Sequence, residues 1–280
     1  MTHAKPVFVV GTGRSGTRSI FRMLRGNSRI EAHHEYGCES IQKVACLFSM
    51  GLITKAEALE KVYNHYHAAI DYCEKDLWLD SSNKASWIIP LLKEIFPSAA
   101  FIHVTRDPRR VVPSFYYKLR EEMYDDKSVM ALAHWVDSGY SENTSPPLEK
   151  KYWWKLELDD NLKVTSSEYS RSRFERCCLH WSNIVEQVNT SFSILPASSS
   201  LTMGLEALVT DKTSVEHFLD FLDLSYNDFY YDFIQKPRNV FLPLEFNCTH
   251  AQLLILHQYC HAAARRLGYN LSAELRSMAY

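Results

Sequence analysis

A glycine-rich segment near the N-terminus has the residue types and the spacing of an anion-binding loop. It reads Gly11-Thr12-Gly13-Arg14-Ser15-Gly16-Thr17-Arg18-Ser19 and follows the apolar run 7–10. Loops with this glycine spacing wrap backbone N–H groups around a phosphate at the start of a helix. Side-chain donors for an anion are also dense here. We therefore predict a phosphate-binding loop rather than a turn that only connects a strand to a helix, with contacts from Gly13, Arg14, Ser15, Gly16, Thr17, Arg18 and Ser19.

One position separates this loop from that of a nucleotide triphosphatase. Such enzymes carry a lysine after the last loop glycine, where it reaches the β- and γ-phosphates. Here the residue after Gly16 is Thr17. This difference favours a substrate other than a triphosphate. A P-loop kinase for a small metabolite stays the alternative, and it would be stabilised by ATP with magnesium.

A second anion site is predicted after another strand. The run 100–104 is apolar and is followed by Thr105-Arg106-Asp107-Pro108. Asp107 can cap a helix that takes Pro108 at its first position and continues to about residue 120. Arg106 and Ser114 could then hold a second anion at the same edge of the sheet. The alternative for Arg106 is an ordinary surface arginine.

These segments belong to an alternation of strands and helices. Strand-like runs at 7–10, 77–79 and 100–104 are separated by helical patterns from Ser19 onward and over 87–96. Such alternation predicts an α/β fold with a parallel sheet. The later pattern predicts a helix over 172–188, strands at 192–195 and 201–205, and helices over 214–222 and 250–267, the last ended by Gly268.

Composition limits the possible functions. The chain has 280 residues, 46% of them hydrophobic, and a net charge of -2. These values are typical of a globular protein and give no overall field that would hold nucleic acid or an anionic membrane. We expect one domain over 1–280, with an insertion or lid at about 121–170 where charges and turn residues accumulate. That insertion contains the cluster Tyr152-Trp153-Trp154, which suits sugars, phenols or core packing alike.

The predicted compartment is the cytoplasm. No apolar run approaches the roughly 18 residues of a membrane span, and no signal-peptide core is apparent. Seven cysteines without a C-x-x-C pair fit reduced core thiols better than disulfides or zinc ligands. Four N-glycosylation sequons, at Asn143, Asn189, Asn247 and Asn270, keep a lumenal domain cut from its anchor as the alternative.

The motifs together resemble those of sulfotransferases that use 3'-phosphoadenosine-5'-phosphosulfate (PAPS). The run 7–17 is similar to the family's 5'-phosphosulfate loop, and the run 101–114 is similar to its 3'-phosphate motif. Weaker likenesses lie at 203–209 and 264–269, although Gly204 replaces the family's usual arginine. The resemblance implies a P-loop-like three-layer fold, with a central parallel sheet flanked by helices. It also implies PAPS as the sulfuryl donor, without a metal, and a 3'-phosphate site at Arg106 and Ser114.

The same resemblance suggests a catalytic base. Protein-tyrosine sulfotransferases have a glutamate 21 residues after the loop arginine, and the same spacing from Arg14 leads to Glu35. The neighbouring His34 could act instead, because other sulfotransferases use a histidine. A solvated carboxylate is the alternative for Glu35, and a structural role is the alternative for His34.

A catalytic lysine is suggested by position. The same relatives have a lysine 13 residues before the proline of a Phe-Pro pair, and Lys84 stands at that distance from Pro97. Its neighbours Asn83 and Ala85 depart from the D-K-S-P letters of the family. A lysine here could stabilise charge on the leaving group, a contact that is stronger in the transition state than in the ground state. A surface lysine is the alternative.

The predicted activity is in-line transfer of a sulfuryl group from PAPS to a hydroxyl, or to an amine, of a small molecule or glycan. Arg14, Glu35 or His34, and Lys84 are the expected catalytic residues. A second alternative is a PAPS-binding module without catalysis, which requires Glu35, His34 and Lys84 to be solvated residues. The sequence leaves the acceptor and the oligomeric state open.

Overall fold

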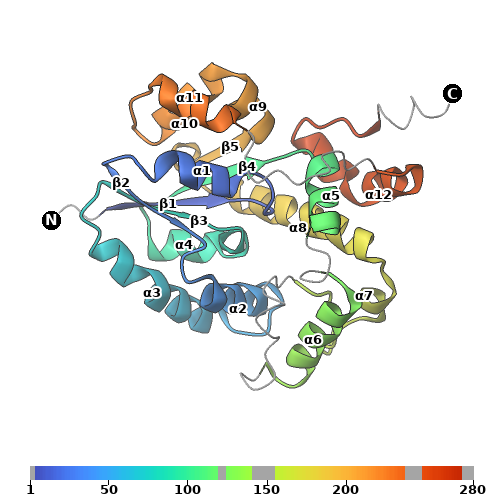
Figure 1. Ribbon diagram of the computed structural model, residues 1–280. Coiled ribbons are helices and arrows are strands. Elements are labelled where there is room, and N and C mark those ends of the chain that lie inside the picture. The colour runs from blue at the N-terminus through green and yellow to red at the C-terminus, as the bar shows by residue number, and fades with distance from the viewer. Residues whose placement is uncertain (1–3, 119–123, 141–154, 237–247, 273–280) are drawn as a thin grey trace. The chain divides into compact units, whose positions relative to one another are not determined.

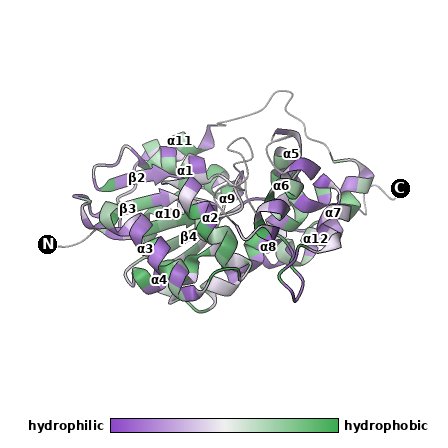
Figure 2. Cartoon of the chain, turned by 90° about the horizontal axis from the view of Figure 1, so that it is seen from below, coloured by the Kyte–Doolittle hydropathy of each residue, from purple (hydrophilic) through white to green (hydrophobic). Residues whose placement is uncertain are grey.

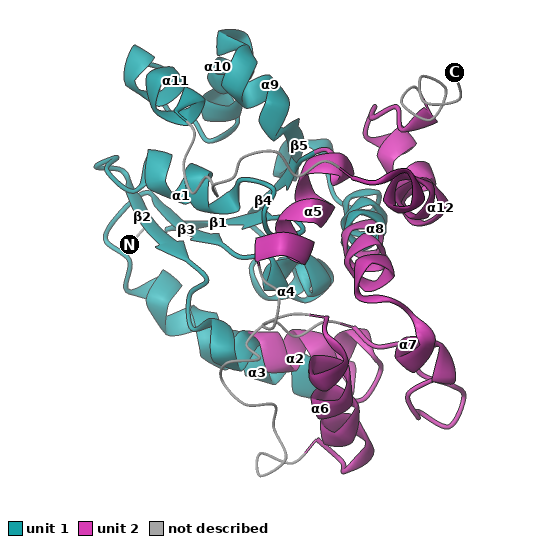
Figure 3. Ribbon diagram, turned by 45° about the vertical axis from the view of Figure 1, so that its right-hand side comes forward, with its two compact units in different colours: residues 1–41, 56–106, 184–244 teal, residues 42–55, 107–183, 245–280 magenta. Residues whose placement is uncertain are grey.

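The computed structural model describes residues 4–118, 124–140, 155–236 and 248–272. The chain forms two compact units, coloured teal and magenta in Figure 3. The first contains residues 1–41, 56–106 and 184–244, and the second contains residues 42–55, 107–183 and 245–280. The single domain and its lid stay predictions, and the cluster 152–154 lies outside the described residues.

The first unit is built on a five-stranded parallel sheet (Figure 1). The strands are β1 (Lys5–Val10), β2 (Ile30–His34), β3 (Leu77–Ser81), β4 (Ala100–Thr105) and β5 (Ser200–Gly204). Their order in the sheet is β2-β3-β1-β4-β5. Because all strands are parallel, their carboxyl ends lie at one edge, where α/β proteins bind ligands. The predicted α/β class is confirmed.

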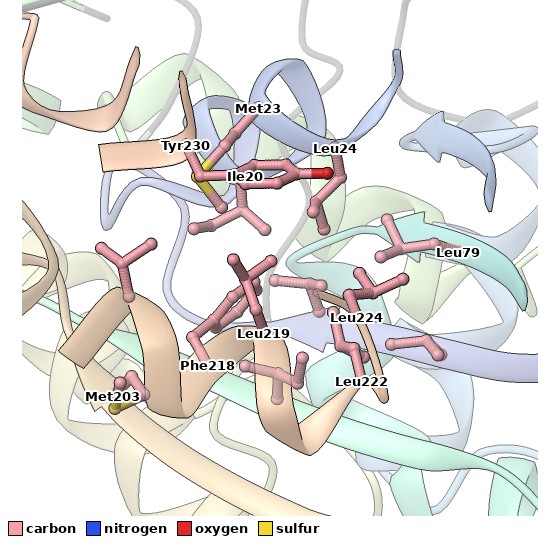
Figure 4. Close-up of a cluster of buried hydrophobic side chains, with 14 of the residues drawn as sticks. Ile20, Met23, Leu24, Leu79, Met203, Phe218, Leu219, Leu222, Leu224 and Tyr230 are labelled. Carbon is pink, nitrogen blue, oxygen red and sulfur yellow. The ribbon is translucent and has the colours of Figure 1, made fainter. Parts of the chain in front are cut away.

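Helices cover the two faces of this sheet. On one face, alternate strand residues such as Val7, Leu79 and Ile102 join a buried apolar cluster with helices α1 (Thr17–Leu24), α9 (Leu205–Thr210), α10 (Lys212–Phe221) and α11 (Asp228–Gln235) (Figure 4). The cluster exists because successive strand side chains point to opposite faces. These helices form one outer layer of the predicted three-layer fold.

The opposite face of the sheet is aromatic. The ring of Phe8 contacts those of Trp78 and Phe101 from the neighbouring strands, Tyr66 from α3 (Lys55–Asp71), and Phe96, which follows α4 (Ile89–Ile95). A short 3-10 helix, η1 (Lys84–Trp87), precedes α4. Figure 2 shows hydrophobic strands beside helices of mixed hydropathy, as expected when each helix buries only one side.

The described part of the second unit is mostly helical. Its helices are α5 (Pro108–Lys118), α6 (Asp126–Asp137), α7 (Ser166–Ser170) and α12 (His250–Arg266), with the larger parts of α2 (Cys38–Ser49) and α8 (Arg173–Phe192). Arg176 is buried and donates hydrogen bonds to the backbone oxygens of Glu168 and Tyr124. No helix of the described residues combines the length and the apolar character that a membrane crossing requires.

Two predicted elements differ from the structure. The run 192–195 is not a strand, because α8 continues to Phe192 and a turn follows, with the Leu195 N–H donating to the Phe192 oxygen. The helix predicted over 87–96 begins later, at Ile89, after η1. The end of α12 agrees with the prediction: Gly268 takes a φ of +83°, and the Tyr269 N–H donates to the Ala264 oxygen.

Candidate active site

The sheet brings most of the predicted site residues to one edge of the first unit. Glu35 follows β2, Lys84 lies three residues beyond β3, the glycine-rich loop follows β1, and Arg106 follows β4. These strands are consecutive neighbours in the order β2-β3-β1-β4. The candidate base, the candidate lysine, the loop and Arg106 therefore follow one another along the carboxyl edge.

The loop packs too closely for side chains at two of its glycines. A Cβ on Gly11 would lie 2.6 Å from the Val104 carbonyl oxygen, which is fixed in β4. A Cβ on Gly16 would meet Leu205 at 2.8 Å, and Gly16 takes a φ of +110°. Larger residues would strain this backbone, so the glycine spacing reflects the loop's shape. Arg14 also has a positive φ, at 55°.

The interior of the loop offers donors that an anion could use. Helix α1 begins at Thr17 without a side-chain cap and without an acidic residue in its first turn. The Ser15 hydroxyl is fully buried and has no hydrogen-bond partner among the described residues. An unsatisfied buried hydroxyl costs about 1–3 kcal/mol, and a bound phosphate or sulfate oxygen would remove that cost. The loop thus fits an anion.

Ser86 fastens the loop to the segment that carries Lys84. Its Oγ accepts a hydrogen bond from the Gly11 N–H at 3.0 Å and donates one to the Gly11 oxygen at 3.1 Å. Both ends of this link are buried. The sequence alone does not single out Ser86, because a serine two residues after a lysine is not itself a recognisable motif.

Lys84 is not a surface residue. Its exposed fraction is 4%, and its Nζ lies 5.4 Å from the centre of the Trp87 ring. That distance allows a cation–π interaction. The preceding Asn83 is also buried, and its Oδ1 has no hydrogen-bond partner within the described part of the chain. A buried lysine beside an anion loop is typical of a functional site rather than of a solvated face.

Glu35 occupies a strained turn directly after β2. Its φ is +58°, a left-handed conformation that non-glycine residues seldom adopt. The turn is held by its backbone: the Glu35 N–H donates to the Ser81 oxygen at 3.2 Å, and the Cys38 N–H donates to the Glu35 oxygen at 3.1 Å. The side chain is half-buried. Strain that surrounding contacts maintain is frequent at functional positions.

His34 is held by the neighbouring strand. Its Nδ1 lies 2.8 Å from the Ser81 carbonyl oxygen, which can only accept, so this ring nitrogen carries the proton in the neutral form. The ring also stacks on Phe21 of α1 with centres 5.7 Å apart. The Ser81 hydroxyl in turn donates to the Thr17 oxygen at 2.9 Å. These contacts connect His34 to β3 and, through Ser81, to Thr17 at the start of α1.

The other predicted site residues lie on or beside the loop and on α5. Arg106 is half-buried, and its Nη1 donates to the Arg14 carbonyl oxygen at 3.2 Å, so it lies against the loop. Arg18 is exposed. Asp107 caps α5 as predicted, because its Oδ1 accepts from the Arg109 N–H at 2.8 Å. Ser114 is buried on α5 in the second unit, and its predicted contact with a 3'-phosphate stays a prediction.

Comparisons with known proteins identify the family of the chain. Residues 6–144 match the model of a sulfotransferase family. No curated protein sequence matches the chain.

Solved sulfotransferase structures are similar over nearly the whole chain. The sulfotransferase domain from the curacin biosynthetic pathway covers 96% of this chain and 99% of its own, with 11% identity and a TM-score of 0.53. The domain from the Synechococcus PCC 7002 olefin synthase covers 96% and 97%, with 16% identity and a TM-score of 0.51. A sulfotransferase from Alicyclobacillus acidocaldarius covers 96% and 98%, with 15% identity and a TM-score of 0.51. At such identities, these likenesses concern the fold. The family match, which includes the glycine-rich loop and Arg106, places residues 6–144 in a sulfotransferase family.

Proposed function

We propose that this sulfotransferase takes its sulfuryl group from PAPS and transfers it to a hydroxyl, or less readily to an amine, of a small molecule or glycan. The observation that carries the proposal is the link between a buried lysine and an anion loop. Ser86 bonds the loop at Gly11, and Lys84 lies two residues away on the same 3-10 helix. This pairing suits a donor whose leaving group gains negative charge beside the loop.

Each candidate residue has a part in the proposed transfer. The loop and the start of α1 bind the 5'-phosphosulfate through N–H groups, with Arg14 and Ser15. The bond between sulfur and the bridging phosphate oxygen breaks while a bond to the acceptor oxygen forms, and Glu35 takes the acceptor's proton. Lys84 balances the charge that develops on the departing adenosine 3',5'-bisphosphate. Positioning and electrostatics supply the catalysis, as in phosphoryl transfer.

The nucleotide product should stabilise the protein without magnesium. Adenosine 3',5'-bisphosphate fills anion sites that exist only in the folded state, so it should raise the melting temperature more than ATP does.

Arg106→Ala should remove a charge-assisted contact worth about 1.5–3 kcal/mol. The variant should therefore bind the bisphosphate about 10- to 150-fold more weakly, with little change for 5'-AMP. Equal losses for both nucleotides, measured by calorimetry, would contradict a 3'-phosphate role.

Turnover with labelled PAPS tests the whole proposal. The protein would be incubated with labelled PAPS and a metabolite extract from its source, and the labelled product identified by mass spectrometry. A labelled product supports the proposal and reveals the acceptor. Bisphosphate binding without any labelled product would favour a binding module, and stabilisation by ATP with magnesium instead would favour a kinase.

A further inference from the structure

Asp80 is a buried carboxyl group that the proposed transfer does not use. It lies on β3, directly opposite His33 of β2 and Phe8 of β1. Its exposed fraction is 0%. The neighbouring rings of Phe8, Tyr66 and Trp78 contact one another, so the carboxyl group sits on the aromatic face of the sheet. Burying a carboxyl group in such surroundings costs free energy unless hydrogen bonds replace those it made to water.

Those hydrogen bonds lead to the turn that carries Glu35. The N–H of Tyr36, the residue after Glu35, donates to Asp80 Oδ1 at 3.1 Å. The Tyr66 hydroxyl donates to Asp80 Oδ2 at 3.4 Å. On the other side of the turn, His65 Nε2 donates to the Tyr36 oxygen at 3.0 Å. Asp80 therefore supplies the side-chain acceptor that fixes the peptide immediately after the strained Glu35.

The charge of Glu35 also reaches Asp80. Burial is the main cause of the raised pKa of Asp80, which lies at about 7; the Tyr36 N–H opposes the rise, and the Glu35 charge adds to it. The titratable groups near Asp80 are Glu35 and Tyr36 of the turn, His33 of β2, Cys38 of α2, and His65 and Tyr66 of α3. The positive charge of Lys84 acts on Cys38, where it opposes the rise in pKa that burial causes.

We propose that Asp80 is a positioning residue for Glu35: its carboxyl group accepts the Tyr36 N–H and so fixes the turn that holds Glu35 at the sheet edge. The inference rests on the proposed function only for the role of Glu35 as base. The hydrogen bonds and the proximity of the charges do not depend on which acceptor is used.

Two substitutions separate position from charge. Asp80→Asn keeps an oxygen for the Tyr36 N–H but removes the charge, whereas Asp80→Ala removes both. Asp76→Asn is the matched control, because Asp76 lies just before the same strand, is more than half exposed and pairs with Arg29. Circular dichroism and thermal unfolding first establish which variants fold. Since asparagine is nearly isosteric with aspartate, Asp80→Asn keeps the test decisive even if the alanine variant does not fold.

The backbone amide of Tyr36 tests the hydrogen bond without any turnover. Its NMR signal and its rate of hydrogen exchange would be compared in the wild type and the folded variants. Asp80→Ala removes the acceptor of the Tyr36 N–H, so its amide should exchange about 10-fold faster or more. Asp80→Asn and Asp76→Asn should keep the protection of the wild type. Equal protection of Tyr36 in Asp80→Ala and the wild type would overturn the proposal.

Kinetics test the positional part. At neutral pH, Asp80→Asn should keep kcat within about 3-fold of the wild-type value, because an oxygen that accepts the Tyr36 N–H remains. A folded Asp80→Ala should lose about 10-fold more, with the affinity for adenosine 3',5'-bisphosphate unchanged. Equal kcat values for the two variants would overturn the positional role. If the wild type itself transfers no sulfuryl group, the proposed function fails, while hydrogen exchange of the Tyr36 amide still decides whether Asp80 fixes the turn.

Discussion

Glu35→Gln is expected to lower kcat about 100-fold or more while adenosine 3',5'-bisphosphate still binds. Glutamine keeps the shape of the side chain but cannot take the acceptor's proton. The backbone bonds of the turn, from the Glu35 N–H to the Ser81 oxygen and from the Cys38 N–H to the Glu35 oxygen, do not involve the carboxylate. The turn should therefore survive the substitution. The measurement is kcat at saturating donor with the acceptor identified from labelled PAPS.

His34→Asn is the matched comparison for the base. His34 Nδ1 already donates to the Ser81 carbonyl, so the histidine is engaged in the framework. Asparagine keeps a donor of similar position, and its cost in kcat should be smaller than that of Glu35→Gln. The advantage of Glu35 depends on its positioning and on late proton transfer. A near-normal Glu35→Gln beside a folded but inactive His34→Asn would move the base to the histidine.

The parts of the molecule that could be predicted from sequence are those with local signals. The loop combines glycine spacing with a strand before it and a helix after it, and all three are found in the structure. Strand β4 and the Asp107 cap are similarly local. Glu35 and Lys84, in contrast, are suggested only by their distances along the chain from motifs that resemble those of a known family. No pattern around either residue indicates a site.

The parts that were missed depend on contacts between distant segments. Strand β2 has only two apolar residues among its five, and its pairing with β3 defines it. Helix α3 is an exception, because it has a local helical signal: its buried residues Ala58, Val62, Tyr66 and Ile70 recur every four positions. Asp80 and Ser86 appear ordinary in the sequence, and their importance comes from partners 44 and 75 residues away. Such partners become visible only when the sheet brings them together.

Lys84→Ala should lower turnover about 100- to 1000-fold while leaving bisphosphate affinity nearly intact. The proposed partner of the ammonium group gains most of its negative charge during transfer, so the contact stabilises the transition state more than the bound donor. The experiment compares kcat at saturating PAPS with the dissociation constant of adenosine 3',5'-bisphosphate. Lys75→Ala, which removes an equal charge from an exposed position in the same unit, should change neither quantity.

A second variant separates lost charge from lost packing. Lys84 is 4% exposed and lies over the Trp87 ring, so alanine leaves a gap that could disturb η1 and, through Ser86, the loop. Lys84→Met fills most of that volume without the charge. If the charge is what matters, methionine and alanine should reduce kcat alike, and the melting temperature of the methionine variant should stay closer to that of the wild type. A variant that instead loses bisphosphate affinity, with kcat at saturation unchanged, would make Lys84 a ground-state binding residue, because an interaction made equally in both states changes KM without changing kcat.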